Sequence, residues 1–153
     1  MIRAFARLGQ LQHITHLIEP TINWLKKDET KNYVLLAELL TDIKQYNEAL
    51  KYADLAIESL MASTDVPSME RGQGYHAKAA ILDINQDIDG AIELYERALA
   101  INPHELRSME LLARLYIRRS RAEDALTLIE RLLTTRPNDS KIIALKHEVS
   151  KLK

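Results

Sequence analysis

The chain has 153 residues, a net charge of −1 and no cysteine. The lack of cysteine excludes disulfides, thiolate catalysis and Cys-ligated metal sites, and the near-zero charge offers no electrostatic footprint for nucleic acid or an anionic membrane. Hydrophobic residues make up 46% of the chain, and Gly and Pro number only four each, so the composition favours helices in a single globular domain.

Residues 1–28 begin with Arg3 and Arg7, well before the first acidic residue, Glu19. An organelle transit peptide has this charge pattern, and that alternative stays open. The same stretch carries a helical stripe of apolar residues broken at Pro20, namely Ile14, Leu17, Ile18, Ile22 and Leu25. We therefore expect a partial, degenerate helical repeat here. Trp24 is a core anchor, a surface aromatic or part of an interface, and packing is the favoured interpretation. No apolar run approaches the roughly 20 residues of a membrane-spanning helix, and a cytoplasmic location is the default expectation.

Residues 30–63 show the spacing of two amphipathic helices. Large and small residues alternate at helical intervals: Tyr33, Leu36, Ala37, Leu40, then Tyr46, Ala49, Ala53 and Ala56. Residues 64–71 are an insertion that lengthens the linker to the next helical segment. Ser63 or Asp65 is a candidate helix cap at this linker, and Pro67 is expected near a helix start.

The segments 72–105 and 106–138 repeat one pattern with a period of about 34 residues. The residues that recur at this spacing are Tyr75 and Met109, Ala79 and Ala113, Ala91 and Ala125, and Pro103 and Pro137. Large, small and large residues at fixed places before a closing proline resemble the tetratricopeptide-repeat (TPR) family, and residues 30–63 share the pattern. The resemblance implies an all-α fold: a right-handed solenoid of stacked antiparallel helix hairpins, forming one domain over 1–153.

Turn residues predict where the helices begin. Ser120 and Glu123 have the spacing of a capping box. Other candidate caps are Asn102, which precedes a helix-starting Pro103, and Asp87 or Asp89, for a helix opening near 90–91. Residues 139–153 are expected to form a last helix, polar enough to cap the array.

In a TPR array the first helix of each repeat lines an inner, concave face, and the resemblance implies that this face binds a protein partner. The charged and polar residues that map onto it are Lys31, Glu38, Asp42, Gln73, His76, Asp83, Arg107, Glu110, Arg114 and Arg118. We expect a bipolar groove whose basic end, at Arg107, Arg114 and Arg118, meets an acidic partner group through bidentate guanidinium bonds. The alternative is a solvated face with local pairs such as Glu110–Arg114.

One TPR subgroup binds chaperone C-termini through a clamp of Lys, Asn, Asn, Lys and Arg. The matching positions here hold Val34, Glu38, Ala77, Arg107 and Leu111. Only Arg107 approximates the clamp, so this mechanism is not expected.

Catalytic signatures are lacking, since the chain has no phosphate loop, dinucleotide fingerprint or nucleophile elbow. His13, His16 and Glu19 have the one-turn spacing of metal ligands, but such spacing is common on polar helix faces. We expect a non-catalytic scaffold without cofactor or metal, which binds a peptide or helix of a partner protein and neither nucleic acid nor membrane.

Two other hypotheses stay open. Ile2 and Phe5 lack a first-helix partner, and apolar surface of that kind favours self-assembly, for example as a homodimer through the N-terminal end. Alternatively, the chain is the TPR fragment of a larger multidomain protein.

Overall fold

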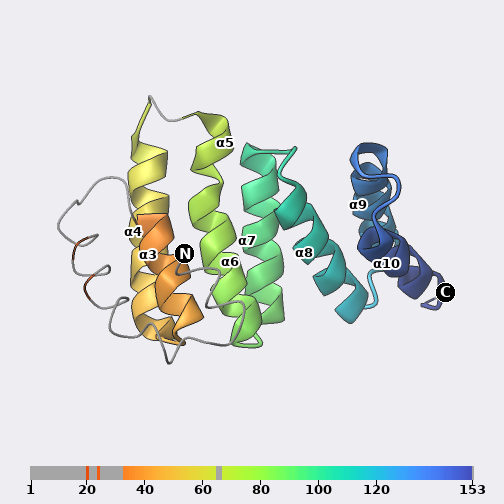
Figure 1. The fold of residues 1–153 in the computed structure, drawn as a ribbon, viewed down its shortest axis with the longest axis horizontal. Coiled ribbons are helices and arrows are strands. Elements are labelled where there is room, and N and C mark those ends of the chain that lie inside the picture. The colour runs from red at the N-terminus through yellow and green to blue at the C-terminus, as the bar shows by residue number, and fades with distance from the viewer. Residues whose placement is uncertain (1–19, 21–23, 25–32, 65–66, 153) are drawn as a thin grey trace.

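The computed structural model describes residues 20, 24, 33–64 and 67–152, and all regular structure in these ranges is helical (Figure 1). The helices are α3 (Tyr33–Asp42), α4 (Tyr46–Ala62), α5 (Ser68–Arg71), α6 (Gln73–Ile84), α7 (Ile88–Ile101), α8 (Leu106–Arg118), α9 (Ala122–Thr135) and α10 (Ser140–Ser150). The expected partial repeat over 1–28 lies outside the described residues, apart from Pro20 and Trp24. The Trp24 side chain is 66% exposed, so the expectation that it packs was wrong.

Three helix hairpins, α3–α4, α6–α7 and α8–α9, stand in a row that ends at α10 (Figure 1). Each hairpin packs on the next, through α4 against α6, α7 against α8, and α9 against α10. The fold is therefore an all-α solenoid of TPR-like hairpins. A single hairpin would leave an apolar side exposed to solvent. In the array the neighbouring hairpin covers that side.

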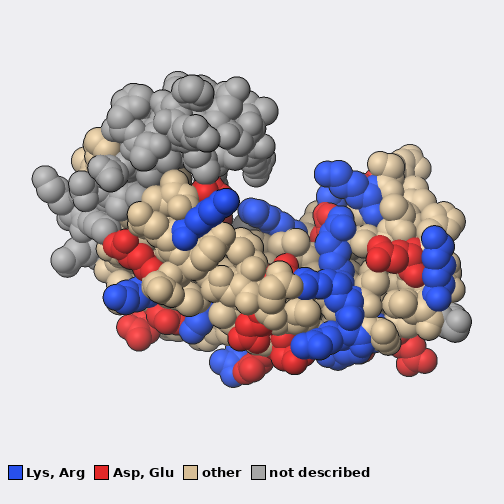
Figure 2. Space-filling view, turned by 90° about the horizontal axis from the view of Figure 1, so that it is seen from below, with Lys and Arg blue, Asp and Glu red and all other residues tan. Residues whose placement is uncertain are grey.

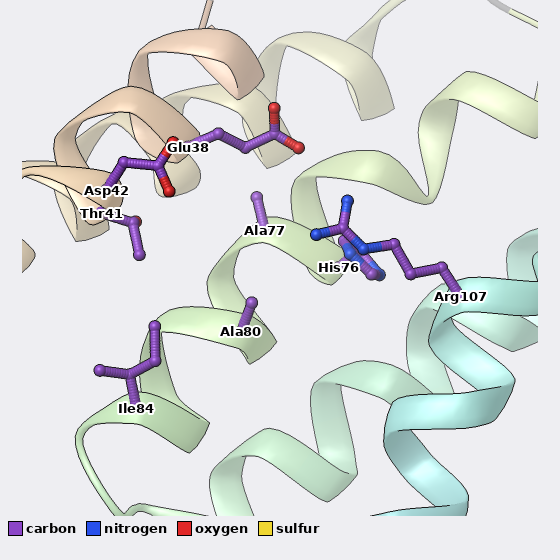
Figure 3. A pocket seen from close by; sticks show the side chains of 8 residues that line it. All are labelled: Glu38, Thr41, Asp42, His76, Ala77, Ala80, Ile84 and Arg107. Carbon is purple, nitrogen blue, oxygen red and sulfur yellow. The ribbon is translucent and has the colours of Figure 1, made fainter. Parts of the chain in front are cut away.

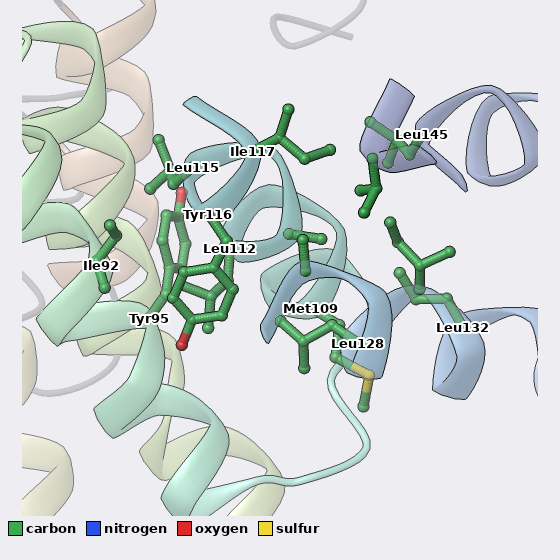
Figure 4. Close-up of a cluster of buried hydrophobic side chains, with 14 of the residues drawn as sticks. Ile92, Tyr95, Met109, Leu112, Leu115, Tyr116, Ile117, Leu128, Leu132 and Leu145 are labelled. Carbon is green, nitrogen blue, oxygen red and sulfur yellow. The ribbon is translucent and has the colours of Figure 1, made fainter. Parts of the chain in front are cut away.

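Alanines occupy the centres of the hairpins. Ala79 and Ala91 in α6–α7, and Ala113 and Ala125 in α8–α9, have no exposed surface. Large side chains fill the volume around them, as Figure 4 shows for the region from α7 to α10, which contains Tyr95, Leu112 and Leu132. The small-and-large pattern predicted from the sequence is confirmed. A larger residue at one of these alanines would overpack the joint at a cost of about 1–3 kcal/mol.

The buried side chains form two clusters that meet at α6. Ala77 and Ile81 belong to the cluster built by α3 and α4, whereas Ala79 belongs to the larger cluster that runs from α6 to α10. Residues four apart share a face of a helix, and a residue two away lies on a different face. α6 is therefore the joint between the two parts of the core.

The turn inside each hairpin contains one residue with left-handed backbone. Lys44, Gln86 and Ser120 have φ angles of 64°, 65° and 56°, and the last two are separated by one repeat period. This conformation places Ser120 before the N-cap of α9, which is Arg121 and makes no side-chain capping bond. The predicted Ser120–Glu123 capping box is therefore wrong.

Helix α8 begins later than predicted. Asn102 Oδ1 accepts a hydrogen bond from His104 N at 3.3 Å, which closes a turn around Pro103 rather than capping a helix there. Glu105 is the N-cap, and Leu106 is the first helical residue. The expected helix start at Pro103 was wrong because a longer carboxylate side chain caps the backbone three positions further on.

Aspartates cap two other helices. Asp87 Oδ1 accepts from Gly90 N at 3.1 Å, so α7 begins at Ile88, slightly earlier than expected. Asp139 Oδ1 accepts from Lys141 N at 3.0 Å at the start of α10. Of the two candidate caps at 87 and 89, the structure selects the first.

The linker between α4 and α6 contains α5, which directly follows Pro67. Ser63 follows the end of α4 and does not cap a helix start. Just beyond the linker, α6 approaches α4 closely at Gly74, where a Cβ atom would lie 2.9 Å from Ile57 N and 3.0 Å from Ile57 Cγ1. The absence of a side chain at Gly74 therefore sets the spacing of the first two hairpins.

Candidate functional site

The first helices of the hairpins line one face of the array. A pocket of about 180 Å³ opens there between α3, α6 and α8, and we call it the α3–α8 pocket (Figure 3). Glu38 and Arg107 extend toward it from opposite sides, and Ala77 and Ala80 lie between them. Its lining residues are Glu38, Thr41, Asp42, His76, Ala77, Ala80, Ile84 and Arg107.

A second pocket, of about 260 Å³, opens one step along the same face between α6, α8 and α10. We call it the α8–α10 pocket. It combines four apolar with four charged residues, namely Leu111, Leu115, Ile117 and Leu145 with Asp83, Arg114, Arg118 and Glu148. The two pockets share α6 and α8, so they are consecutive parts of one groove-like surface.

His76 ties α6 to α8 at the wall of the α3–α8 pocket. Its Nδ1 lies 2.7 Å from Ser108 Oγ and 3.6 Å from Glu105 Oε2, and its ring meets Tyr95 edge-on at 5.5 Å between centroids. Burial lowers the pKa of His76, Glu105 opposes this shift, and Arg107 adds to it. The imidazole is therefore neutral at pH 7, and it contributes a hydrogen bond rather than a charge.

Glu105 and Ser108 contact His76 behind the wall of the α3–α8 pocket, and neither was predicted to belong to the groove. The Glu105 carboxylate accepts from Arg107 N at 3.1 Å and from Ser108 N at 2.5 Å, so its charge serves the N-terminus of α8. Ser108 is fully buried. It follows Gly74 by one repeat period, so a small buried residue recurs at this place in the first helices.

Two of the three arginines at the predicted basic end are already paired. Arg118 Nη1 lies 2.6 Å from Asp83 Oδ1, and its Nη2 donates to Gln86 Oε1 at 3.0 Å. Arg114 Nη2 donates to Glu110 Oε1 at 3.0 Å, which is the local pair that the alternative hypothesis named. The Asp83–Arg118 pair joins α6 to α8 between residues distant in the sequence, and no local spacing rule reveals it.

Two charged groups on the groove surface remain unmatched. The Arg107 guanidinium and the Glu148 carboxylate make no ion pair or side-chain hydrogen bond with the residues that the structure describes. Glu38 and Asp42, by contrast, are each engaged in an interaction. Among the described lining residues, the charge without an internal partner is therefore one cation in the α3–α8 pocket and one anion in the α8–α10 pocket.

The predicted site residues fall into two groups along this surface. The α3–α8 pocket brings together Glu38, Asp42, His76 and Arg107, and the α8–α10 pocket brings together Asp83, Arg114 and Arg118. Glu110 joins the second group through Arg114, Gln73 is an exposed residue at the start of α6, and Lys31 lies outside the described residues. The structure adds the apolar residues Ile84, Leu115 and Leu145, which were not predicted to line the groove.

Acidic and basic side chains lie next to one another over much of the surface seen in Figure 2, and Lys and Arg side chains gather to the right of its centre. Pairs between helices contribute to this mixture. Arg119 Nη2 lies 2.7 Å from Asp89 Oδ2, and Lys78 Nζ lies 2.6 Å from Asp54 Oδ1. Several surface charges are thus neutralised by neighbours on another helix.

Neither a metal cluster nor a membrane helix is found in the ranges that the structure covers. Within residues 20, 24, 33–64 and 67–152, no three His, Asp or Glu side chains gather as metal ligands, and no helix is long and apolar enough to cross a membrane. The candidate ligands His13, His16 and Glu19 lie outside these ranges.

Comparison with known proteins gives a consistent picture. Two family models described as tetratricopeptide repeat match residues 30–59 and 84–148, together more than half of the chain. A Podosopora anserina protein described as a kinesin light chain with nearly identical TPR-like repeats aligns with a TM-score of 0.71 at 21% identity, over 99% of this chain and 81% of that one. MamA aligns with a TM-score of 0.66 at 17% identity, over 94% and 89%. No curated sequence matches, and at these identities the solved structures show a shared fold.

Proposed function

The chain belongs to the tetratricopeptide-repeat family, and we propose that it binds a short peptide or helix of a partner protein along the surface formed by the α3–α8 and α8–α10 pockets. TPR folds are generally non-catalytic scaffolds for protein interactions, and the chain is a protein-interaction repeat module. The proposal concerns where on this module the partner binds.

The observation that carries the proposal is the succession of two pockets on one face, each with apolar side chains beside charged ones. Burying one leucine-sized side chain contributes about 1.5–3 kcal/mol, whereas one exposed ion pair contributes about 0–1 kcal/mol. The apolar residues therefore supply most of the affinity, and the charged residues set the orientation of the ligand. Such a surface suits a segment with several anchoring side chains.

The chaperone-tail clamp is not part of this proposal. Val34, Glu38, Ala77 and Leu111 replace four of its five polar residues. Among the described residues that line the α3–α8 pocket, Arg107 has no second Lys or Arg beside it to bind a further carboxylate.

A selection from phage-displayed random peptides tests the proposal without knowledge of the natural partner. We expect enriched peptides to bind the wild-type chain in calorimetry and to lose at least tenfold in affinity on Ala80→Trp, because the indole fills the α3–α8 pocket. The matched control is Arg97→Trp, which adds the same side chain at an exposed position of α7. Circular dichroism checks that both variants keep the helix content of the wild type. Equal affinity for both variants would place binding elsewhere on the molecule.

Self-assembly is the competing proposal. Its motivating residues, Ile2 and Phe5, lie outside the described residues, so it rests on the sequence alone. Light scattering at high protein concentration decides it, because a homodimer has twice the monomer mass, and a constant monomer mass refutes it.

A further inference from the structure

Most of the charged side chains that line the two pockets already interact with another residue of the chain. A charged ligand group would have to compete with these internal partners. An acidic ligand group that approached Arg118 would have to displace Asp83, which lies 2.6 Å away, and at Arg114 it would have to displace Glu110 at 3.0 Å. Each displaced carboxylate would lose a charge-assisted hydrogen bond. Arg107 and Glu148 have no such internal competitor among the described residues.

The repeat relates the positions of these two groups. Glu148 follows Arg114 by one repeat period, and the same period separates the starts of α8 and α10, so the two residues occupy equivalent places on neighbouring first helices. Arg107 lies about two turns earlier, or about 10 Å along the helix axis. With helix spacings of about 8–10 Å, Arg107 and Glu148 are on the order of 14 Å apart, about four residues of extended chain.

The α8–α10 pocket, which includes Glu148, offers apolar side chains beside charges that are already paired. Leu111, Leu115 and Leu145 line it together with Asp83, Arg114 and Arg118. A ligand that reaches Glu148 therefore meets leucine side chains in this pocket, and it gains most if its own side chains there are apolar.

We propose that the partner segment carries an acidic residue that pairs with Arg107, a basic residue about four positions away that pairs with Glu148, and apolar residues between them. This inference rests on the proposed function and specifies the chemistry of its ligand. It differs from the expectation of a wholly basic end, since two of those three arginines are internally paired. Charge complementarity with the two unmatched groups selects this occupant.

Reciprocal charge reversal tests the inference on peptides from the phage selection. We expect enriched peptides to contain this acidic, apolar and basic pattern and to lose affinity about fivefold to tenfold on Arg107→Glu, consistent with a solvent-exposed ion pair turned into a repulsion. Changing the acidic residue of the peptide to Lys should restore binding to this variant. Glu148→Lys should likewise weaken binding and be rescued by a Glu in place of the peptide's basic residue.

The control is Lys146→Glu, which makes the same change of net charge as Arg107→Glu at an exposed position of α10. Arg107→Glu is expected to fold, because an acid in the first turn of a helix is favourable, and Arg107→Gln provides a second variant. Loss without rescue, loss at only one of the two sites, or equal loss on Lys146→Glu would overturn the inference. If Ala80→Trp still abolishes binding in those cases, the proposed function stands while this inference fails.

Discussion

At the scale of single residues, strain in the hairpin turns is open to direct measurement. Lys44, Gln86 and Ser120 all adopt left-handed backbone, which costs a non-glycine residue roughly 1 kcal/mol. Ser120 is the cleanest of the three, because Gln86 also bonds Arg118. The strained conformation is retained because it allows the short turn between the two helices of each hairpin.

We predict that Ser120→Gly raises the free energy of unfolding by about 0.5–1 kcal/mol, because glycine adopts positive φ without steric cost. Ser120→Val should lower it, since a β-branched residue resists this conformation. Urea denaturation measures both. As a control, Thr127→Gly inside α9 should lose about 0.3–0.5 kcal/mol, because glycine is a poorer helix former than threonine. A destabilised Ser120→Gly would mean that the turn relaxes in solution.

His76 makes the stability depend on pH. Burial lowers its pKa in the folded chain below the ordinary value of 6.5, so between these two values the unfolded chain binds more protons and acid favours unfolding. The stabilising contribution is complete above pH 6.5 and is lost as the pH falls through this window. We predict that urea denaturation from about pH 7.5 to about pH 5.5 shows a steeper loss for the wild type than for His76→Gln. Equal slopes would show that His76 titrates normally in the folded chain.

At the scale of secondary-structure elements, the approach of α6 to α4 depends on one glycine. Gly74→Ala would improve the helix propensity of α6 by about 1 kcal/mol, but the new Cβ would lie 2.9 Å from the backbone nitrogen of Ile57. Backbone cannot move aside as a side-chain tip can. We predict a net loss of about 1–3 kcal/mol in the free energy of unfolding. Gln73→Ala, an exposed neighbour in the same helix, should be neutral or stabilising, and a similar result for Gly74→Ala would contradict the packing seen here.

The elements were more predictable from the sequence than the contacts between them. The repeat period and the alanines at 79, 91, 113 and 125 predicted the hairpins, because close helix packing permits only small residues at those places. The predicted capping box at Ser120 is wrong because Ser120 adopts left-handed backbone, so the N-cap of α9 is the next residue, Arg121. The Asp83–Arg118 pair could not be predicted, since it depends on how two hairpins stack rather than on spacing within one helix. The predicted basic end of the groove therefore included Arg114 and Arg118, whose charges are paired within the folded chain.

At the scale of the whole molecule, the division of the core at α6 predicts uneven cooperativity. In a solenoid each repeat contacts only its neighbours, so local damage need not spread. Leu36→Ala removes a buried side chain from the cluster of α3 and α4 and should cost about 2–5 kcal/mol there. We predict that hydrogen exchange then accelerates in α3 and α4 while α8–α10 keep their protection. Uniform acceleration along the whole chain would instead show a single cooperative unit.

The two interfaces between hairpins, which we call the first seam (α4 against α6) and the second seam (α7 against α8), are stabilised by different contacts. At the first seam, α4 and α6 approach closely at Gly74, and one exposed pair, Asp54–Lys78, joins them. At the second, α7 and α8 pack less extensively, and the exposed pairs Asp83–Arg118 and Asp89–Arg119 hold the turn side. Dissolved salt screens exposed pairs and leaves backbone contact unchanged. We therefore expect high ionic strength to loosen the second seam, where the two pockets meet, more than the first.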